Sequence, residues 1–240
     1  MTFTYDDCLR PQFTEDIFKA LLHNQSLNPF GPEWTGKKRL LDDLENLAQE
    51  KDIIVLRFDL RAYKKDYYGY LRKAETLIQQ HIPAPSIDAT RLPPIADQIP
   101  NAQLPALSTI LNYPTTILPQ KIWLFMDHFD VLLNNEEQVF PFNFFTDLNF
   151  IKNQNRFTLC CTSNVSHKGS TLHFPNDPRQ VSRTSFLELS PKDIPDLNYQ
   201  ALHQELSRQL HHTKNWQQAY DYQKVHLIQA IQGTKQPLAY

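Results

Sequence analysis

The sequence has few of the residues that mark several protein classes. It holds only five glycines and three cysteines among 240 residues. Cys160 and Cys161 are adjacent in an apolar run and Cys8 stands alone, a spacing that fits neither a disulfide framework nor a metal knuckle. We therefore predict that the cysteines are reduced packing residues.

Long apolar runs and an excess of one charge are lacking as well. No apolar stretch approaches the roughly 20 residues that a membrane-spanning helix needs, and the first ten residues carry two acids where a secretory signal would be basic. The 24 basic and 26 acidic residues give a formal charge of −2, which provides no general attraction to nucleic acid or anionic lipid. We expect a cytoplasmic protein that binds neither nucleic acid nor membrane.

The patterns that are present predict an α/β fold. Helical periodicity in FTEDIFKALLHNQ, KKRLLDDLENLAQEK and YGYLRKAETLIQQHI alternates with the short apolar runs DIIVLRFDL, KIWLFMD and RFTLCCTSN. Such runs are typical of strands buried on both faces of a parallel sheet. We expect Thr14 to cap the first helix and SFLELS to form a further short strand. The prediction is a three-layer α/β fold with a mainly parallel sheet.

The domain organisation follows from the distribution of proline. Residues 83–119 hold eight of the 17 prolines, and we interpret them as a surface excursion, with a flexible linker as the alternative. They interrupt an α/β domain that we assign to residues 1–196. Residues 197–240 predict a small helical, lid-like region, and the ending QPLAY inside a helical pattern is consistent with a truncated chain.

Two of the scarce glycines form the most informative motif. Gly31 and Gly36 lie five residues apart, directly before Lys37, in the pattern G-x-x-x-x-G-K of a phosphate-binding loop. In such a loop, backbone N–H groups and the N-terminus of the following helix surround a phosphate chain, and the lysine neutralises its charge. A turn that binds nothing is the alternative. The candidate nucleotide-binding residues are Gly31, Pro32, Glu33, Trp34, Thr35, Gly36, Lys37, Lys38 and Arg39.

Two features of this motif depart from the usual pattern. Pro29 makes QSLNPF a poor strand before the loop. Lys38 stands where a serine or threonine hydroxyl would bind Mg²⁺. At about 4 Å, an ammonium repels a unit positive charge by roughly 1 to 4 kcal/mol. We expect poor Mg²⁺ binding unless Lys38 turns into solvent, and a direct contact from Lys38 to phosphate is the other option.

An acidic strand supplies the second half of the predicted site. Asp127 follows five apolar residues in IWLFMDHFD, where it would hold the hydration shell of Mg²⁺. His128 stands where many such enzymes have a glutamate that orients the attacking water. A neutral histidine accepts a proton but lacks the carboxylate charge, so we expect slow hydrolysis or none. The alternative is that Asp127 and Asp130 only cap the strand and the turn after it.

Ser163 and Asn164 end the strand RFTLCCTSN. A polar residue there is a candidate contact to the terminal phosphate or to the attacking water, and Asn164 is our choice. Polar residues at strand ends are also common without any ligand.

Other groups of residues give weaker evidence for a functional site. The histidines 203, 211 and 212 lie on one polar segment without an acid or cysteine to complete a metal site. The tyrosines 63, 67, 68 and 70 with Lys64, Lys65 and Arg72 could stack on nucleic acid, but half-buried tyrosines at a helix start are the interpretation we favour. Arg179 and Arg183 could reach a nucleotide. No G-x-S-x-G elbow supports a serine hydrolase.

Taken together, these segments resemble the AAA-like P-loop domains of the STAND class, the bacterial signalling and defence NTPases. The resemblance rests on SLNPFGPEWTGKKRLLDDL, VLRFDLR, IWLFMDHFDVLLNN, FPFNFFTDLNFIKNQNRFTLCCTSN and QAIQGTKQPLAY. It implies a phosphate-binding role for Lys37, a Mg²⁺-side acid at Asp127 and a sensor at Asn164. Lys38, His128 and the proline-rich excursion depart from the pattern.

The preferred function is a switch that binds ATP or a related nucleotide and changes its contacts with a partner protein or a fused effector, either alone or as an oligomer. The alternative is a nucleotide-free degenerate fold that acts as a protein-interaction scaffold, favoured by the loss of the hydroxyl and of the catalytic acid. A DNA-associated ATPase would need a basic face that the charge balance does not provide.

Overall fold

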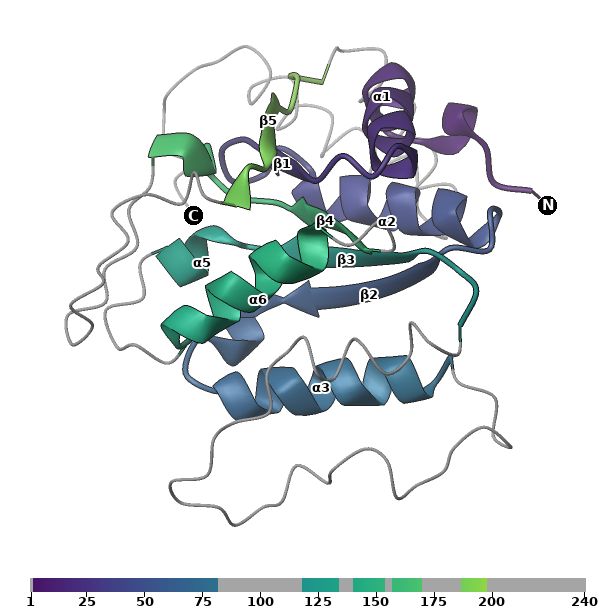
Figure 1. Cartoon of the computed structure of the whole chain (residues 1–240). Coiled ribbons are helices and arrows are strands. Elements are labelled where there is room, and N and C mark those ends of the chain that lie inside the picture. Colours follow the sequence, from purple (N-terminus) through teal and green to yellow (C-terminus); the bar gives the residue numbers. More distant parts are fainter. Residues whose placement is uncertain (1, 82–117, 134–139, 154–156, 170–186, 198–240) are drawn as a thin grey trace, which may run out of the picture.

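The computed structural model describes residues 2–81, 118–133, 140–153, 157–169 and 187–197 (Figure 1). The strands are β1 (Leu27–Phe30), β2 (Ile54–Asp59), β3 (Ile122–Asp127), β4 (Phe157–Cys161) and β5 (Ser190–Asp193). The α-helices are α1 (Pro11–Leu22), α2 (Lys37–Gln49), α3 (Tyr67–Gln79), α5 (Asp130–Leu133) and α6 (Phe142–Lys152). Short 3-10 helices cover Tyr5–Asp7, Leu60–Tyr63 and His167–Gly169.

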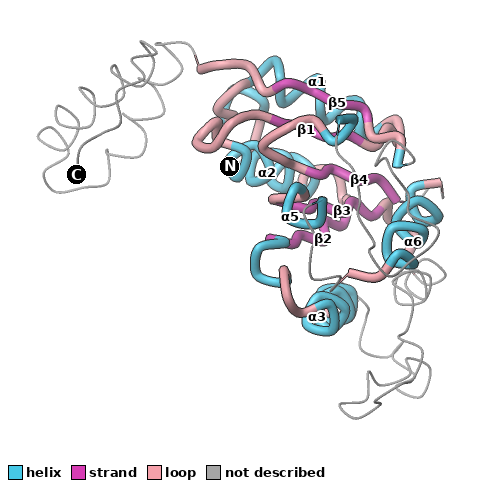
Figure 2. Tube along the Cα trace, turned by 90° about the vertical axis from the view of Figure 1, so that its left-hand side faces the viewer, coloured by secondary structure: helices cyan, strands magenta, loops and turns pink. Residues whose placement is uncertain are grey.

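The five strands form one parallel sheet in the order β2-β3-β4-β1-β5 (Figure 2). The register of β2 and β3 runs from Ile54 opposite Ile122 to Asp59 opposite Asp127. The predicted parallel sheet is therefore confirmed. The acidic strand β3 is not the direct neighbour of β1, however, because β4 lies between them.

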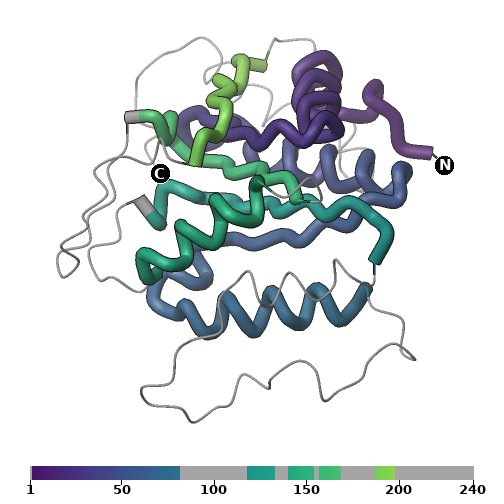
Figure 3. Tube along the Cα trace, viewed as in Figure 1, coloured from purple at the N-terminus to yellow at the C-terminus, as the bar shows by residue number. Residues whose placement is uncertain are grey.

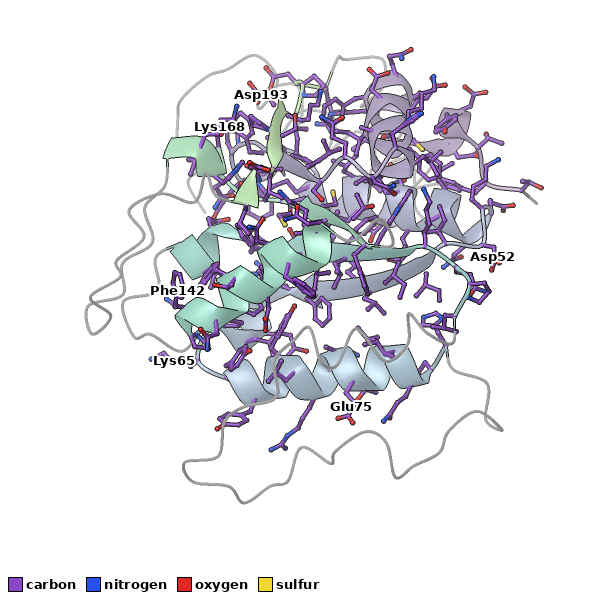
Figure 4. The ribbon with its side chains drawn as sticks, viewed as in Figure 1. Asp52, Lys65, Glu75, Phe142, Lys168 and Asp193 are labelled. Carbon is purple, nitrogen blue, oxygen red and sulfur yellow. The ribbon has the colours of Figure 1, made fainter. Side chains whose placement is uncertain are left out.

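Helices cover both faces of this sheet, with α1 and α2 on one side and α3 and α6 on the other (Figures 1 and 2). Successive side chains of β3 alternate between the two layers: Leu124 and Met126 join the core under α3 and α6, whereas Trp123 and Phe125 join the core under α1 and α2. The three-layer prediction is confirmed. On α3, Glu75 points away from the sheet (Figure 4).

The cysteines are buried and free, as predicted. Cys160 packs into the layer of α1 and α2, and Cys161 packs into the opposite layer. Adjacent residues of a strand point to opposite faces. The two thiols are therefore separated by the sheet itself.

The tyrosines at the start of α3 mostly serve the core. Tyr67 and Tyr70 are 5% and 0% exposed and contact the rings of Phe140 and Phe144. Tyr68 is exposed. The expectation of half-buried tyrosines holds for Tyr63, whereas Tyr67 and Tyr70 are more deeply buried than expected.

The first helix begins earlier than expected. Pro11 occupies its first position and Arg10 is the N-cap residue, because proline lacks the N–H that this position leaves unpaired and already has a helical φ. Thr14 is a buried residue inside α1. The prediction that Thr14 caps the helix is therefore wrong.

The central strand β1 contains Pro29, contrary to the expectation that this residue weakens it. The N–H of Gly31 donates to the carbonyl of Ser163 at 3.2 Å, and the N–H of Ser163 donates to the carbonyl of Pro29 at 3.2 Å. The next bond of this parallel ladder would run from residue 29 to the carbonyl of Cys161, and proline cannot donate it. The side-chain Nδ2 of Asn28 donates to that carbonyl instead, at 2.6 Å.

The last strand also differs from its prediction. It covers Ser190–Asp193 and pairs with β1 from Leu27 opposite Ser190 to Phe30 opposite Asp193, so segments from both ends of the described chain lie side by side (Figure 3). SFLELS is not this strand, because Glu188 has a φ of 47° and breaks the extended backbone before Ser190.

Several predictions fall outside the described residues. They concern most of the excursion at 83–119, the helical region after 197, the three histidines at 203, 211 and 212, and Arg179 and Arg183. In the part of the chain that the structure describes, no helix has the length and apolar character needed to cross a membrane.

Candidate functional site

The carboxyl ends of four strands meet at one edge of the sheet and form a pocket of about 360 Å³. In open parallel sheets this edge is where ligands bind. The loop after β1, the residues after β2, the end of β3 and the turn after β4 all contribute to its wall. Its lining residues are Glu33, Trp34, Gly36, Lys37, Lys38, Arg61, Asp127, His128 and Asn164.

Eight of these nine residues are members of the predicted set, and Arg61 is the addition. The structure thus brings the loop, the acidic strand and Asn164 to one cavity. Four predicted loop residues, Gly31, Pro32, Thr35 and Arg39, do not line it. The guanidinium of Arg39 binds Asp43 at 2.6 Å and the carbonyl of Asp7 at 3.1 Å, which ties α2 to the N-terminal segment.

The loop conformation requires glycine at the second glycine position of the motif. Gly36 has a φ of 80° and is the N-cap of α2, a left-handed conformation that glycine adopts without steric cost. Trp34 also has a positive φ, of 70°, and its side chain is 96% exposed. A bulky residue in this region carries a steric cost, and the nearly complete exposure of its indole leaves little packing within the described chain to offset it.

Lys37 is the buried cation of the site. Its Nζ donates to the carbonyl oxygens of Gly31 and Pro32, both at 2.7 Å, and the residue is only 6% exposed. Burial lowers the pKa of its ammonium, and the carboxylates of Asp127, Asp130 and Glu33 act in the opposite direction. The lysine is therefore held at the loop, within the electrostatic reach of the acids across the pocket.

The N-terminus of α2 contributes backbone donors. Its first bond of the i to i+4 type runs from the N–H of Leu40 to the carbonyl of Gly36 at 2.9 Å, and Gly36 provides no side-chain cap. The N–H groups of residues 37 to 39 therefore precede the first intrahelical bond. Together with the helix dipole they favour an anion at this end of the helix.

Asp127 is 5% exposed, and one of its oxygens is already used. Its Oδ1 accepts hydrogen bonds from the N–H of His128, at 3.0 Å, and from the hydroxyl of Thr162. Its Oδ2 lies 3.7 Å from Nε2 of His128. Thr162 follows β4 and was not among the predicted residues. The polar run TSN after the strand was a signal for it.

Asn164 is held by Asp130. Its backbone N–H and its Nδ2 donate to the two carboxylate oxygens of Asp130, at 3.3 and 3.2 Å. Its Oδ1 is buried and has no hydrogen-bond partner within the described residues. A buried, unpaired oxygen at a pocket wall is suited to accept a hydrogen bond from a bound water.

Arg61 comes from the turn after β2 and is positioned by Asp59. Its Nη2 and Nε bind the two carboxylate oxygens at 2.7 and 3.1 Å, which lowers the pKa of Asp59. The pairing of Asp59 with Asp127 in the sheet register places this turn beside the acidic strand. An arginine directly after a buried strand was the available sequence signal.

Arg10 links the loop to the end of the described chain. This buried guanidinium donates to the carbonyl of Thr35 at 2.7 Å and to the carbonyl of Pro195 at 2.8 Å. Burial lowers its pKa, against the opposing effect of Asp196 and Asp43. Residues 9–13 and 195–197 enclose a second pocket, of about 270 Å³.

The donor set does not fit a divalent metal in the usual P-loop manner. Lys38, an exposed ammonium at the pocket wall, replaces the hydroxyl ligand, and Oδ1 of Asp127 already accepts two hydrogen bonds. Within the described ranges no group of three or more histidines, cysteines or acids is arranged to hold a metal ion. Three cations, Lys37, Lys38 and Arg61, and two carboxylates, Glu33 and Asp127, therefore line the pocket.

Comparison with known proteins identifies similar folds but no relative by sequence. No family model matches the sequence, and no curated protein matches it. Among solved structures, a DNA replication initiation factor aligns with a TM-score of 0.53 and 15% identity, over 96% of this chain and 66% of that one. AMPPCP-bound DnaA from Aquifex aeolicus aligns with a TM-score of 0.51 and 15% identity, over 97% and 63%. An Orc1 protein from Aeropyrum pernix in complex with DNA gives a TM-score of 0.47 at 16% identity, over 81% and 47%.

This chain therefore spans between about half and two thirds of the length of these structures. At such low identity the likeness concerns the fold alone. The parallel five-stranded sheet with helices on both faces agrees with it. The chain has the P-loop α/β fold of the AAA+ type.

Proposed function

We propose that this chain binds ATP or a related nucleotide at the pocket between the loop 31–38 and Asp127. The observation that carries the proposal is the placement of Lys37: a buried ammonium at the N-terminus of α2, on a cavity of about 360 Å³. Charged phosphates would replace the two loop carbonyls as partners of its Nζ, or be bound beside them. The AMPPCP bound to the DnaA of similar fold supports the same ligand class.

The proposed role is a regulatory switch with slow hydrolysis or none. His128 occupies the position after Asp127, and its imidazole lacks the negative charge that would activate a water strongly. The buried oxygen of Asn164 can orient a water, but Nδ2 of the same residue is engaged by Asp130. Nucleotide binding, and not nucleotide hydrolysis, would therefore change the contacts with a partner protein or a fused effector.

Arg10 is the proposed connection between the nucleotide-binding loop and the region after residue 197. Its guanidinium joins the carbonyl of Thr35 in the loop to that of Pro195, just before the region after 197. A nucleotide that changes the loop would change this link. The helical region predicted at 197–240 would then alter its contacts with the partner.

The first test is calorimetric titration of ATP into the wild-type chain and into Lys37→Ala, both with Mg²⁺ and with EDTA. Loss of a charge-assisted contact to phosphate costs about 1.5 to 3 kcal/mol. We expect Lys37→Ala to weaken binding by at least about tenfold. Lys51→Ala is the matched control, because Lys51 is an exposed lysine just beyond the far end of the same helix.

Thermal unfolding of each variant establishes that it folds, since Lys37 also bonds to the loop. Absence of heat for the folded wild-type chain under both conditions would disprove nucleotide binding. Hydrogen exchange of residues 198–240 with and without ATP tests the switch. If ATP binds and hydrogen exchange in these residues is unchanged, the proposal of nucleotide binding stands and the proposal of a switch is disproved.

One observation favours the alternative of a nucleotide-free scaffold. Two of the three N–H donors of the Lys37 ammonium bond to carbonyls of its own loop. Partner binding that is unaffected by Lys37→Ala and by ATP would support this alternative.

A further inference from the structure

The pocket carries three cations from two different elements. Lys37 and Lys38 begin α2, and Arg61 comes from the turn after β2. Lys37 is buried, whereas Lys38 is exposed at the wall and Arg61 is 60% exposed. The cations therefore approach the cavity from both the loop and the opposite strand.

Hydrogen bonds to Asp59 hold the side chain of Arg61 in one orientation. Asp59 binds its Nε and Nη2, and the backbone N–H of Arg61 donates to the same carboxylate at 3.1 Å. Its Nη1 has no hydrogen-bond partner within the described ranges. A guanidinium fixed on one side retains donors for an anion on the other.

The acids of the pocket are less available than its cations. Asp127 accepts hydrogen bonds from Thr162 and from the N–H of His128, and Asp130 accepts two from Asn164. Glu33 is exposed at the loop. Asp127 and Asp130 thus have protein partners that do not require a metal ion.

We propose that the site binds the nucleotide in its metal-free form, with Lys38 and Arg61 supplying the positive charge that Mg²⁺ supplies in other P-loop proteins. This inference rests on the proposed nucleotide binding. Free ATP carries two more negative charges than its Mg²⁺ complex. Three cations and two carboxylates line the cavity, and Lys38 takes the sequence position of the metal-ligand hydroxyl, so the lining favours the more negative form and disfavours the divalent ion.

The test compares ATP affinity in EDTA and in excess Mg²⁺ for the wild-type chain, for Lys38→Thr and for Lys38→Ala. We expect the wild-type chain to bind at least about tenfold more tightly in EDTA. Lys38→Thr restores the hydroxyl and removes the ammonium, so its preference should reverse in favour of Mg²⁺. Lys38→Ala should lose the EDTA preference without gaining affinity from Mg²⁺.

Arg61→Gln gives an independent measurement at the opposite wall. In the wild-type background it should weaken ATP binding in EDTA by several fold. In the Lys38→Thr background, measured with Mg²⁺, it should reduce ATP affinity less. Wild-type binding that requires Mg²⁺ would overturn the metal-free proposal and leave nucleotide binding standing. Absence of binding under both conditions would overturn the proposed function and this inference with it.

Discussion

His167 is a titratable residue buried against Asn28 of β1. It is 0% exposed, its N–H donates to Oδ1 of Asn28 at 3.0 Å, and its Nδ1 lies 3.0 Å from the same oxygen. Burial, with a smaller effect of Lys168, lowers the pKa of His167 to about 4. The folded protein therefore keeps this imidazole neutral at pH values where the unfolded chain takes up a proton.

This difference predicts a pH-dependent stability. A histidine in the unfolded chain titrates near 6.5. Neutral His167 therefore makes its full contribution to the free energy of unfolding above that pH, and this contribution is lost as the pH falls toward about 4. The loss approaches about 1.4 kcal/mol per pH unit in this window. Urea unfolding at pH 7.5 and pH 5 measures it. His167→Gln should flatten the slope, whereas His23→Gln, at an exposed position, should leave it unchanged.

At the scale of single residues, the sequence predicted those whose role follows from local spacing. Gly36 and Lys37 are recognisable because a loop motif is contiguous, and Asp127 because it ends an apolar run. Arg61 and Thr162 were missed. Their roles depend on which strands are neighbours in the sheet, and the sequence does not state that order.

The strand β1 depends on a side chain that replaces a backbone donor. Asn28 donates to the carbonyl of Cys161 and to Oγ of Ser163, at 2.6 and 2.8 Å, and its oxygen accepts from His167. Asn28→Ala should reduce the free energy of unfolding by about 3 kcal/mol, because several buried partners lose their bonds.

A double-mutant cycle isolates the replacement of the ladder bond. Pro29→Ala restores a backbone N–H at the position facing Cys161. Asn28→Ala should therefore cost about 1 kcal/mol less in the Pro29→Ala background. Denaturant unfolding of the four chains gives the coupling. Costs that add within about 0.5 kcal/mol would contradict this role of Asn28.

Among the elements, strongly periodic segments were predicted well and segments shaped by tertiary contacts were not. The helix α2 and the strand β3 follow from their apolar patterns alone. The strand β1 was underrated, because the rule against proline in a central strand assumes that no side chain can replace the missing donor. The strand β5 was placed too early, because its pairing with β1 is set by the register and not by hydrophobicity.

At the scale of the whole molecule, Arg10 bonds to the carbonyl of Pro195, which lies 185 positions further along the chain. Arg10→Leu would leave two carbonyl groups, those of Thr35 and Pro195, without this donor. We expect a loss of about 2 to 4 kcal/mol in the free energy of unfolding. Urea unfolding measures the loss, and Lys73→Leu on the exposed face of α3 is the control. A loss below about 0.5 kcal/mol would show that the link is not needed for stability.

The same link brings the entry and the exit of the α/β fold to one place. Residues 9–13 and 195–197 line one small cavity. Folds whose two ends meet tolerate circular permutation and insertion into another polypeptide. A polypeptide joined at either end of the described α/β part would therefore attach next to the guanidinium of Arg10, which bonds to both the loop at Thr35 and the segment at Pro195.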